Sequence, residues 1–197
     1  MKEVSIILVG LSAYGIENYD TACLRAKTAG GVEILFVTSH AVGETLPLMS
    51  EFIFEKTRVE LQAGSALRAV FNDGQTREYR LPASDQSFNK LWQCIEAVRT
   101  GFRPVCGPEA ARAQTLCMNG AQESMPEIIS FPQGMIRRRR DEKGQEYVFA
   151  ENLSATLENC YGEWKLPSEK DIPWSRPGRR IGLSAYEWYP GGKRAME

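Results

Sequence analysis

Residues 4–82 are divided into short apolar segments by tight turns, and this pattern restricts the folds open to the chain. Residues 32–39 read VEILFVTS, a run rich in β-branched and apolar residues that follows the turn signal AGG. Further on, Asp73-Gly74 separates two strand-like segments, and this dipeptide is a strong signal for a hairpin turn. Short strands joined in this way pair antiparallel, so the pattern predicts an antiparallel sheet.

The spacing of apolar residues changes to a helical period between residues 84 and 124. The first predicted helix is capped by Ser84 or Asp85 and ended by Gly101, and its apolar face consists of Phe88, Leu91, Trp92, Ile95 and Val98. The second helix begins near Pro108, and it carries a stripe of small residues at Ala110, Ala113, Cys117 and Ala121. Such a stripe allows a helix to approach its neighbour closely.

After Pro126 the pattern returns to strands. A hairpin is predicted with its turn at residues 141–144, and a short helix within residues 151–164 turns Leu153, Leu157 and Cys160 inward. A final strand follows within residues 180–192. Together the elements predict an α+β fold, an open and mostly antiparallel sheet with helices packed on one face, in a single domain over residues 1–197.

Composition argues against several classes of protein. The formal net charge of -1 gives no bulk attraction to nucleic acid or to an anionic membrane, and no apolar run approaches the ~20 residues of a membrane span. In the run Arg137–Arg140, alternate side chains of a strand point to opposite faces and acidic residues lie nearby, which favours a solvated hairpin or a subunit contact. The five cysteines form no CxxC pair, which is typical of free thiols in the cytoplasm, and with one histidine we expect no metal site.

The stretch Gly10–Gly15, GLSAYG, raises the alternative of a dinucleotide-binding turn between a strand and a helix. Ser12 stands where that fingerprint requires its second glycine, and the next strand ends without an acidic residue. We therefore expect two plain strands. A small nucleotide-binding protein remains an alternative that requires a parallel βαβ start, and an antiparallel pairing of Asp20 with Ser39 would exclude it.

Four segments in a fixed order carry a resemblance to a known family: IENYDTACLR, GGVEILFVTSHAV, AVFNDGQTREY and FNKLWQCIEAVRTGFRPVCGPEAARAQTLCMNGAQES. Together they resemble the C-terminal domain of the Gfo/Idh/MocA oxidoreductases, the relatives of glucose–fructose oxidoreductase and inositol dehydrogenase. The likeness is clearest over residues 4–124. Residues 125–197, with the hairpin, the short helix and the final strand, match less distinctly.

The resemblance implies a substrate-side and oligomerisation domain of an NAD(P)-dependent sugar or polyol oxidoreductase, whose exposed sheet face packs against a second subunit in a dimer or tetramer. The family's nucleotide-binding domain, its E-K-P motif and its helix with an aspartate and a histidine are missing from this chain. Because NAD(P) carries the hydride chemistry, we expect the chain alone to bind no cofactor, and we assign no catalytic residue. Ser39, His40 and Asp20 are expected to face a substrate, since their side chains suit hydrogen bonding to a polyol.

A second hypothesis is a non-catalytic, self-associating protein that uses a sheet face as its interface. In the predicted strand, Val32, Ile34 and Phe36 alternate with Leu35 and Val37, so both faces of the sheet are apolar at this strand. Helices can cover one face, and the other then needs a separate cover.

Overall fold

The computed structural model describes residues 5–12, 18–62, 66–81, 88–144 and 146–189. The chain forms two compact units. The first contains residues 1–44 and 108–197, and the second contains residues 45–107. Each unit has its own sheet, and the single domain expected over residues 1–197 stays a prediction.

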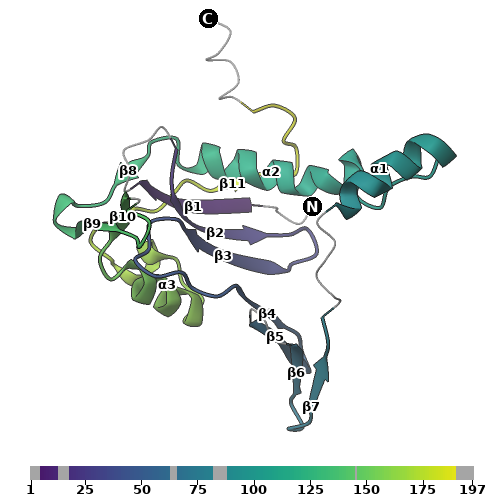
Figure 1. Ribbon diagram of the computed structural model, residues 1–197, viewed down its shortest axis with the longest axis horizontal. Coiled ribbons are helices and arrows are strands. Elements are labelled where there is room, and N and C mark those ends of the chain that lie inside the picture. The colour runs from purple at the N-terminus through teal and green to yellow at the C-terminus, as the bar shows by residue number, and fades with distance from the viewer. Residues whose placement is uncertain (1–4, 13–17, 63–65, 82–87, 145, 190–197) are drawn as a thin grey trace, which may run out of the picture. The chain divides into compact units, whose positions relative to one another are not determined.

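The first unit is built on an open sheet whose three long strands follow one another in sequence (Figure 1). Its strand order is β11-β1-β2-β3, and β8 pairs with β1. The strands are β1 (Ser5–Ser12), β2 (Thr21–Lys27), β3 (Glu33–Ser39), β8 (Ile129–Ser130) and β11 (Ile181–Gly182). Within this sheet every pair is antiparallel except β1 with β8, which confirms the predicted mostly antiparallel arrangement.

The start of the chain does not form the parallel βαβ unit that the nucleotide-binding alternative requires. Residues 21–27 form a strand rather than a helix, and this strand pairs antiparallel with both β1 and β3. Its side chains alternate between two buried surfaces, which matches the period of two of a strand. Gly10 lies inside β1, whereas residues 13–15 of the glycine stretch lie outside the described residues.

Strand β2 separates two buried cores. The helices that complete them are α2 (Pro108–Ser124) and α3 (Leu153–Gly162). Ala22 and Ala26 pack in one core with Ala121 of α2, whereas Cys23 packs in the other with Leu153 of α3. Because successive side chains of a strand point to opposite faces, α2 and α3 lie on opposite faces of the sheet (Figure 1). The α+β class is confirmed, but the helices were expected on one face of the sheet, whereas the alternation in β2 gives each sheet face a helix of its own.

The stripe of small residues predicted on α2 is buried only at its C-terminal end. Ala121 is buried and Cys117 is half-buried, but Ala110 and Ala113 are exposed. The buried residues of this helix all lie in its last five positions, 120–124. The close approach that the stripe predicted is therefore limited to the end of the helix.

A two-stranded hairpin follows α2 and contains the arginine run. Its strands are β9 (Ile136–Arg140) and β10 (Glu146–Ala150). The turn has Gly144 at a φ of 78°, in the left-handed region that favours glycine, which confirms the predicted hairpin. Arg138 pairs with Glu146 at 2.7 Å, and Arg139 donates a hydrogen bond to the Gly43 carbonyl oxygen at 2.8 Å. The arginines are thus engaged within the unit and beside an acidic residue, as the sequence predicts.

Arg25 on β2 forms hydrogen bonds with the C-terminal part of the first unit. The Arg25 guanidinium donates to both carboxylate oxygens of Glu169, at 2.5 and 2.9 Å, and to the Trp164 carbonyl oxygen at 2.7 Å. Two short 3-10 helices also belong to this unit, η1 (Gln133–Met135) and η2 (Pro167–Lys170), and η2 carries this glutamate. The residues of α3 that were predicted to point inward are buried: Leu153, Leu157 and Cys160.

The second unit contains a four-stranded antiparallel sheet and one helix. The sheet has the order β4-β5-β6-β7, and its strands are β4 (Met49–Ile53), β5 (Thr57–Gln62), β6 (Leu67–Phe71) and β7 (Thr76–Tyr79). Gly74 has a φ of 86° between β6 and β7, which confirms the predicted turn. The helix α1 (Asn89–Thr100) ends at Gly101, whose φ is 74°. Its predicted caps, Ser84 and Asp85, lie outside the described residues.

Candidate functional site

The three residues predicted to face a substrate lie together at one end of the β2–β3 pair. Thr21 pairs with Ser39 across the two strands. One residue beyond this pair, the His40 N–H donates to the Asp20 carbonyl oxygen at 2.8 Å. The two strands pair antiparallel as expected, but the register differs by one residue from the expected Asp20–Ser39 pair, because Ser39 lies opposite Thr21 and Asp20 lies opposite His40. Asp20, Ser39 and His40 nevertheless lie together at this strand end.

A chain of hydroxyl hydrogen bonds crosses this strand end. The Thr21 hydroxyl donates to Asp20 Oδ1 at 3.0 Å, and Thr21 Oγ1 lies 2.8 Å from Ser39 Oγ. A hydroxyl has one hydrogen to donate, so Thr21, which gives its hydrogen to the carboxylate, must accept from Ser39. Ser39 Oγ in turn accepts the Ala41 N–H at 2.9 Å. All three bonds thus point toward the Asp20 carboxylate.

Of the three predicted residues, only His40 is open to solvent. Asp20 is buried, with 7% of its surface exposed, and Ser39 is half-buried. The His40 side chain is exposed and makes no side-chain hydrogen bond with any described residue. Asp20 and Ser39 therefore stabilise the strand end, and the imidazole is the group that a ligand can reach. The assignment of all three as substrate-binding residues stays a prediction.

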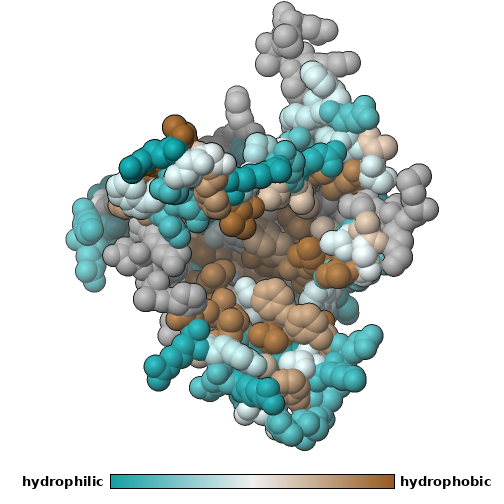
Figure 2. Space-filling view, turned by 90° about the vertical axis from the view of Figure 1, so that its right-hand side faces the viewer, coloured by the Kyte–Doolittle hydropathy of each residue, from teal (hydrophilic) through white to brown (hydrophobic). Residues whose placement is uncertain are grey.

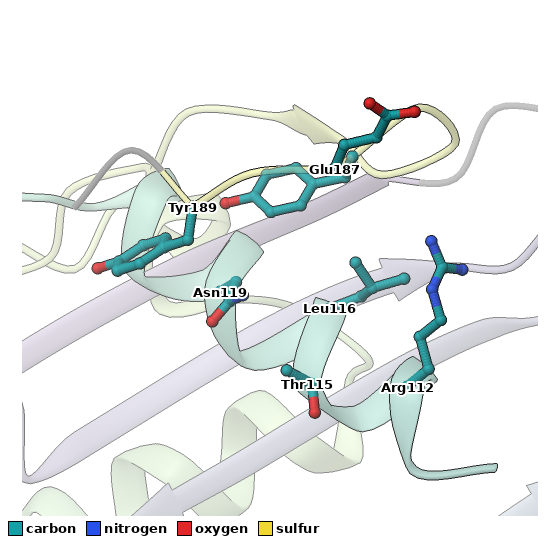
Figure 3. A pocket seen from close by; sticks show the side chains of 7 residues that line it. Arg112, Thr115, Leu116, Asn119, Glu187 and Tyr189 are labelled. Carbon is teal, nitrogen blue, oxygen red and sulfur yellow. The ribbon is translucent and has the colours of Figure 1, made fainter. Parts of the chain in front are cut away.

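A groove between α2 and residues 186–189 is a feature that the sequence does not predict (Figure 3). Its volume is about 390 Å³, and its lining residues are Arg112, Thr115, Leu116, Asn119, Tyr186, Glu187 and Tyr189. The four residues from α2 recur at the spacing of one helical face, and this spacing is the signal that the sequence contains. The segment that lies opposite them is identified only by the tertiary structure.

The tyrosines in and beside this groove hold their protons tightly. Burial, and then the nearby Glu123 carboxylate, raises the pKa of Tyr186 to about 12. Burial, and then Tyr189, also raises the pKa of Tyr19. Both phenols are neutral near pH 7, so they can donate hydrogen bonds but do not serve as general bases. The groove therefore offers polar contacts, and we assign no reaction to it.

The sheet of the second unit has one apolar face and one charged face. Residues paired across antiparallel strands share a face. One face contains seven apolar or aromatic residues, which we call the apolar sheet face, namely Phe52, Val59, Leu61, Leu67, Ala69, Phe71 and Tyr79; the same face also carries Ser50, Thr57 and Arg77. The Arg77 guanidinium lies over the Phe71 ring, 5.4 Å from its centroid. The opposite face carries the charged residues Glu51, Arg58, Glu60, Arg68 and Glu78, together with Met49, Ile53, Val70 and Thr76. On that face Arg58 forms an ion pair with Glu60 at 3.0 Å.

The apolar sheet face is open to solvent at its two outer strands, whereas Val59, Leu61, Leu67 and Phe71 on the inner strands are half-buried. Phe52 is 52% exposed and Tyr79 is 50% exposed. Among the described residues of the second unit, Ala69 is the only buried one. Apolar side chains accordingly lie at the surface of the molecule, where they are brown in Figure 2. An antiparallel sheet with one apolar face normally has that face packed against another layer.

Helix α1 has a second uncovered apolar surface. Its apolar stripe is the set predicted from the sequence, Phe88, Leu91, Trp92, Ile95 and Val98. Every member is exposed, from 38% for Ile95 to 87% for Val98. The predicted helix is confirmed, but among the described residues its apolar stripe belongs to neither buried core.

Strand β3 in the first unit shows the alternation that the self-association hypothesis used. Leu35 and Val37 pack against the core that contains α3. Ile34 and Phe36 point to the other face, where they are 45% and 51% exposed. One face of this strand is therefore covered by the chain itself, and the other remains partly open.

Some features can be stated only for the described part of the chain. Those residues contain no group of three or more histidine, cysteine, aspartate or glutamate side chains placed to hold a metal ion. Within the same residues, no helix combines the length and the apolarity needed to cross a membrane. All five cysteines are free thiols.

Comparisons of the chain with protein-family models, with curated proteins and with solved structures give no match. The resemblance to the C-terminal domain of the Gfo/Idh/MocA oxidoreductases therefore stays a prediction.

Proposed function

We propose that this chain is a self-associating domain and that copies of it associate through the apolar sheet face of the second unit. The observation that supports this proposal is the contrast between the two faces of that sheet. One face is charged and suits water, whereas the other is apolar and has Phe52 and Tyr79 half exposed. Covering such a face removes apolar area from water, which stabilises the associated state by about 25 cal/mol for each Å².

The extent of burial in the second unit supports the same proposal. Ordering each residue costs roughly 1–2 kcal/mol, and apolar burial has to offset that cost. Ala69 is the only buried residue among the described residues of this unit, and an alanine contributes little apolar area. A four-stranded sheet of this kind needs a further layer, and self-association supplies one.

The test uses two neighbouring residues of β4 that point to opposite faces. Phe52 lies on the apolar sheet face, and Ile53, which is 61% exposed, lies on the charged face. We expect Phe52→Asp to convert the oligomer into a monomer, because the new carboxylate would be buried without a partner. The matched control Ile53→Asp makes a similar change on the other face and is expected to keep the wild-type mass.

The measurement is molar mass by light scattering during size-exclusion chromatography, over a series of protein concentrations. A wild-type chain that is monomeric at every concentration would overturn the proposal. Equal loss of mass in Phe52→Asp and Ile53→Asp would also overturn it, because the effect would then not depend on the apolar sheet face.

We further propose, from the family resemblance, that the self-associating domain is the substrate-side part of an NAD(P)-dependent sugar or polyol oxidoreductase. The exposed His40 side chain at the end of β3 supports this wider role, since a substrate can reach it. We assign the chain no catalytic residue and no cofactor site of its own. Calorimetric titration with NADH and NADPH is expected to give no binding, and saturable binding would replace the wider role by a nucleotide-binding function.

A further inference from the structure

We propose that the apolar sheet face of one copy is covered by helix α1 of a second copy, and that the two copies exchange their α1 helices symmetrically. This inference rests on the proposed function, because it names what covers the sheet in the associated state. The proposed exchange requires no partner other than a second copy of the chain.

The helix and the sheet face match in size. Neighbouring strands lie about 4.8 Å apart and rise about 3.3 Å per residue, so four strands of 4–6 residues give a face of about 19 by 17 Å. The 12 residues of α1 form a cylinder about 18 Å long and about 10 Å wide. A helix packed on one face of an antiparallel sheet is a common two-layer arrangement. One α1 therefore covers the middle of one apolar sheet face.

The helix also matches the sheet in chemistry. Its apolar stripe occupies one side, and Lys90, Gln93 and Glu96 lie outside the stripe. A helix of 12 residues is marginally stable in water and gains its stability from packing of its apolar side. In the single chain this side is exposed, with Trp92 at 63% and Val98 at 87%. The stripe thus requires an apolar partner of the kind that the sheet face provides.

The area favours an exchange that uses both surfaces of each copy. From the exposed fractions of its five side chains, the α1 stripe offers about 500 Å² of apolar surface. A stable interface takes about 800 Å² from each partner, so pairing of two α1 stripes alone falls short. The apolar sheet face adds further area, chiefly from Phe52 and Tyr79, which are 52% and 50% exposed. The reciprocal exchange uses both surfaces of each copy, and it therefore comes closer to the required area than a pairing that uses one of them.

The experiment blocks one surface at a time. Phe52→Asp blocks the sheet face, and Trp92→Asp blocks the α1 stripe. Lys90→Gln is the control for α1, because it makes the same change in net charge at an exposed residue outside the stripe. Ile53→Asp is the control for the sheet. Each variant must keep the wild-type circular dichroism spectrum, which shows that it is folded. An aspartate variant that fails this test is replaced by Phe52→Ser or Trp92→Ser.

A reciprocal dimer has two contacts, each between one sheet face and one α1. In a dimer of a single blocking variant, both contacts include the substituted surface. We expect the dissociation constant of Phe52→Asp and of Trp92→Asp, each alone, to rise at least about a hundredfold. The two controls are expected to match the wild type. When the blocking variants are mixed in equal amounts, the intact α1 of one copy meets the intact sheet of the other. We therefore expect a mixed dimer with a dissociation constant well below that of either variant alone, measured by sedimentation velocity with one variant labelled.

Each contrary result identifies what has failed. A dimer that persists in Trp92→Asp alone means that the sheets pair with each other, which overturns the exchange but leaves the proposed self-association through the sheet. A dimer that persists in Phe52→Asp alone overturns the role of the sheet face in both proposals. Two monomeric variants that do not form a mixed dimer at any concentration also overturn the exchange. A monomeric wild type overturns the proposed function itself.

Discussion

Replacement of Thr21 by valine tests the hydroxyl chain at the end of β2 and β3. Valine keeps the shape of threonine but removes the donor to Asp20 and the acceptor of Ser39. Thr21 is fully buried, at 0% exposure, so water cannot replace the lost hydroxyl. A hydrogen bond contributes roughly 0.5–1.5 kcal/mol between neutral groups and roughly 1.5–3 kcal/mol with a charged group. The added methyl group returns up to about 0.8 kcal/mol through apolar burial. We therefore expect Thr21→Val to lower the free energy of unfolding by about 2 kcal/mol.

Thr38→Val is the matched control for this substitution. Thr38 lies on β3 near the same strand end, is half-buried, and its hydroxyl makes no hydrogen bond with any described residue. We expect it to change the free energy of unfolding by less than about 0.5 kcal/mol. The assay is urea unfolding followed by circular dichroism at one fixed protein concentration, because association adds to the apparent stability. Equal stabilities of Thr21→Val and Thr38→Val would refute the reasoning that the hydroxyl chain stabilises the strand end.

Two further predictions concern the buried thiol of Cys23. Burial raises the pKa of Cys23 to about 12, whereas Cys94 on α1 is exposed. We expect a thiol reagent at pH 8 to modify Cys94 rapidly and Cys23 only in urea, and mass spectrometry that finds both modified at the same rate in the folded protein would contradict this. Because Cys23 keeps its proton to higher pH in the folded state than in the unfolded state, its contribution to stability is complete below pH 9 and is lost as the pH rises toward about 12. Urea unfolding between pH 8 and 11 is expected to show this loss in the wild type and a smaller loss in Cys23→Ala.

The local features of the fold could be predicted from the sequence because a few neighbouring residues determine them. Gly74 and Gly144 mark the two hairpin turns, and Gly101 ends α1, since each has a positive φ that favours glycine. The inward residues of α3 follow from helical spacing alone. Each of these signals lies within about one turn or one hairpin of the element that it predicts.

The arrangement of the elements depends on contacts between distant segments, and the sequence signals it less well. The spacing of Ala110 and Ala113 matches that of Ala121, yet only Ala121 meets the sheet, because the contact covers one end of α2. The alternation of Ala22 and Cys23 in β2 is visible in the sequence, but it does not reveal that a helix lies on each face. The position of a helix on a sheet can be assigned only when the segments that contact each other are known.

In the candidate site, too, local features could be predicted from the sequence and contacts between distant segments could not. The antiparallel pairing of the strands that end at Asp20 and Ser39 could be predicted, because a turn joins two neighbouring strands. The role of Thr21 as the link between the two side chains could not, because the register had to be known to within one residue. The groove beside Tyr186 is a further example, since its two walls come from segments that no local pattern connects.

The contrast in burial between the two units connects the fold with the proposed function. In the first unit, β2 has a buried core on each face, so its sheet is stabilised within one copy of the chain. In the second unit, Ala69 is the only buried residue among those described, while the sheet and α1 each present an apolar surface to solvent. Conformational entropy opposes the order of both units, and the second unit buries few of its described residues to offset that cost. In the proposed association, an α1 and a sheet face from a second copy would add to this unit the apolar burial that its described residues lack.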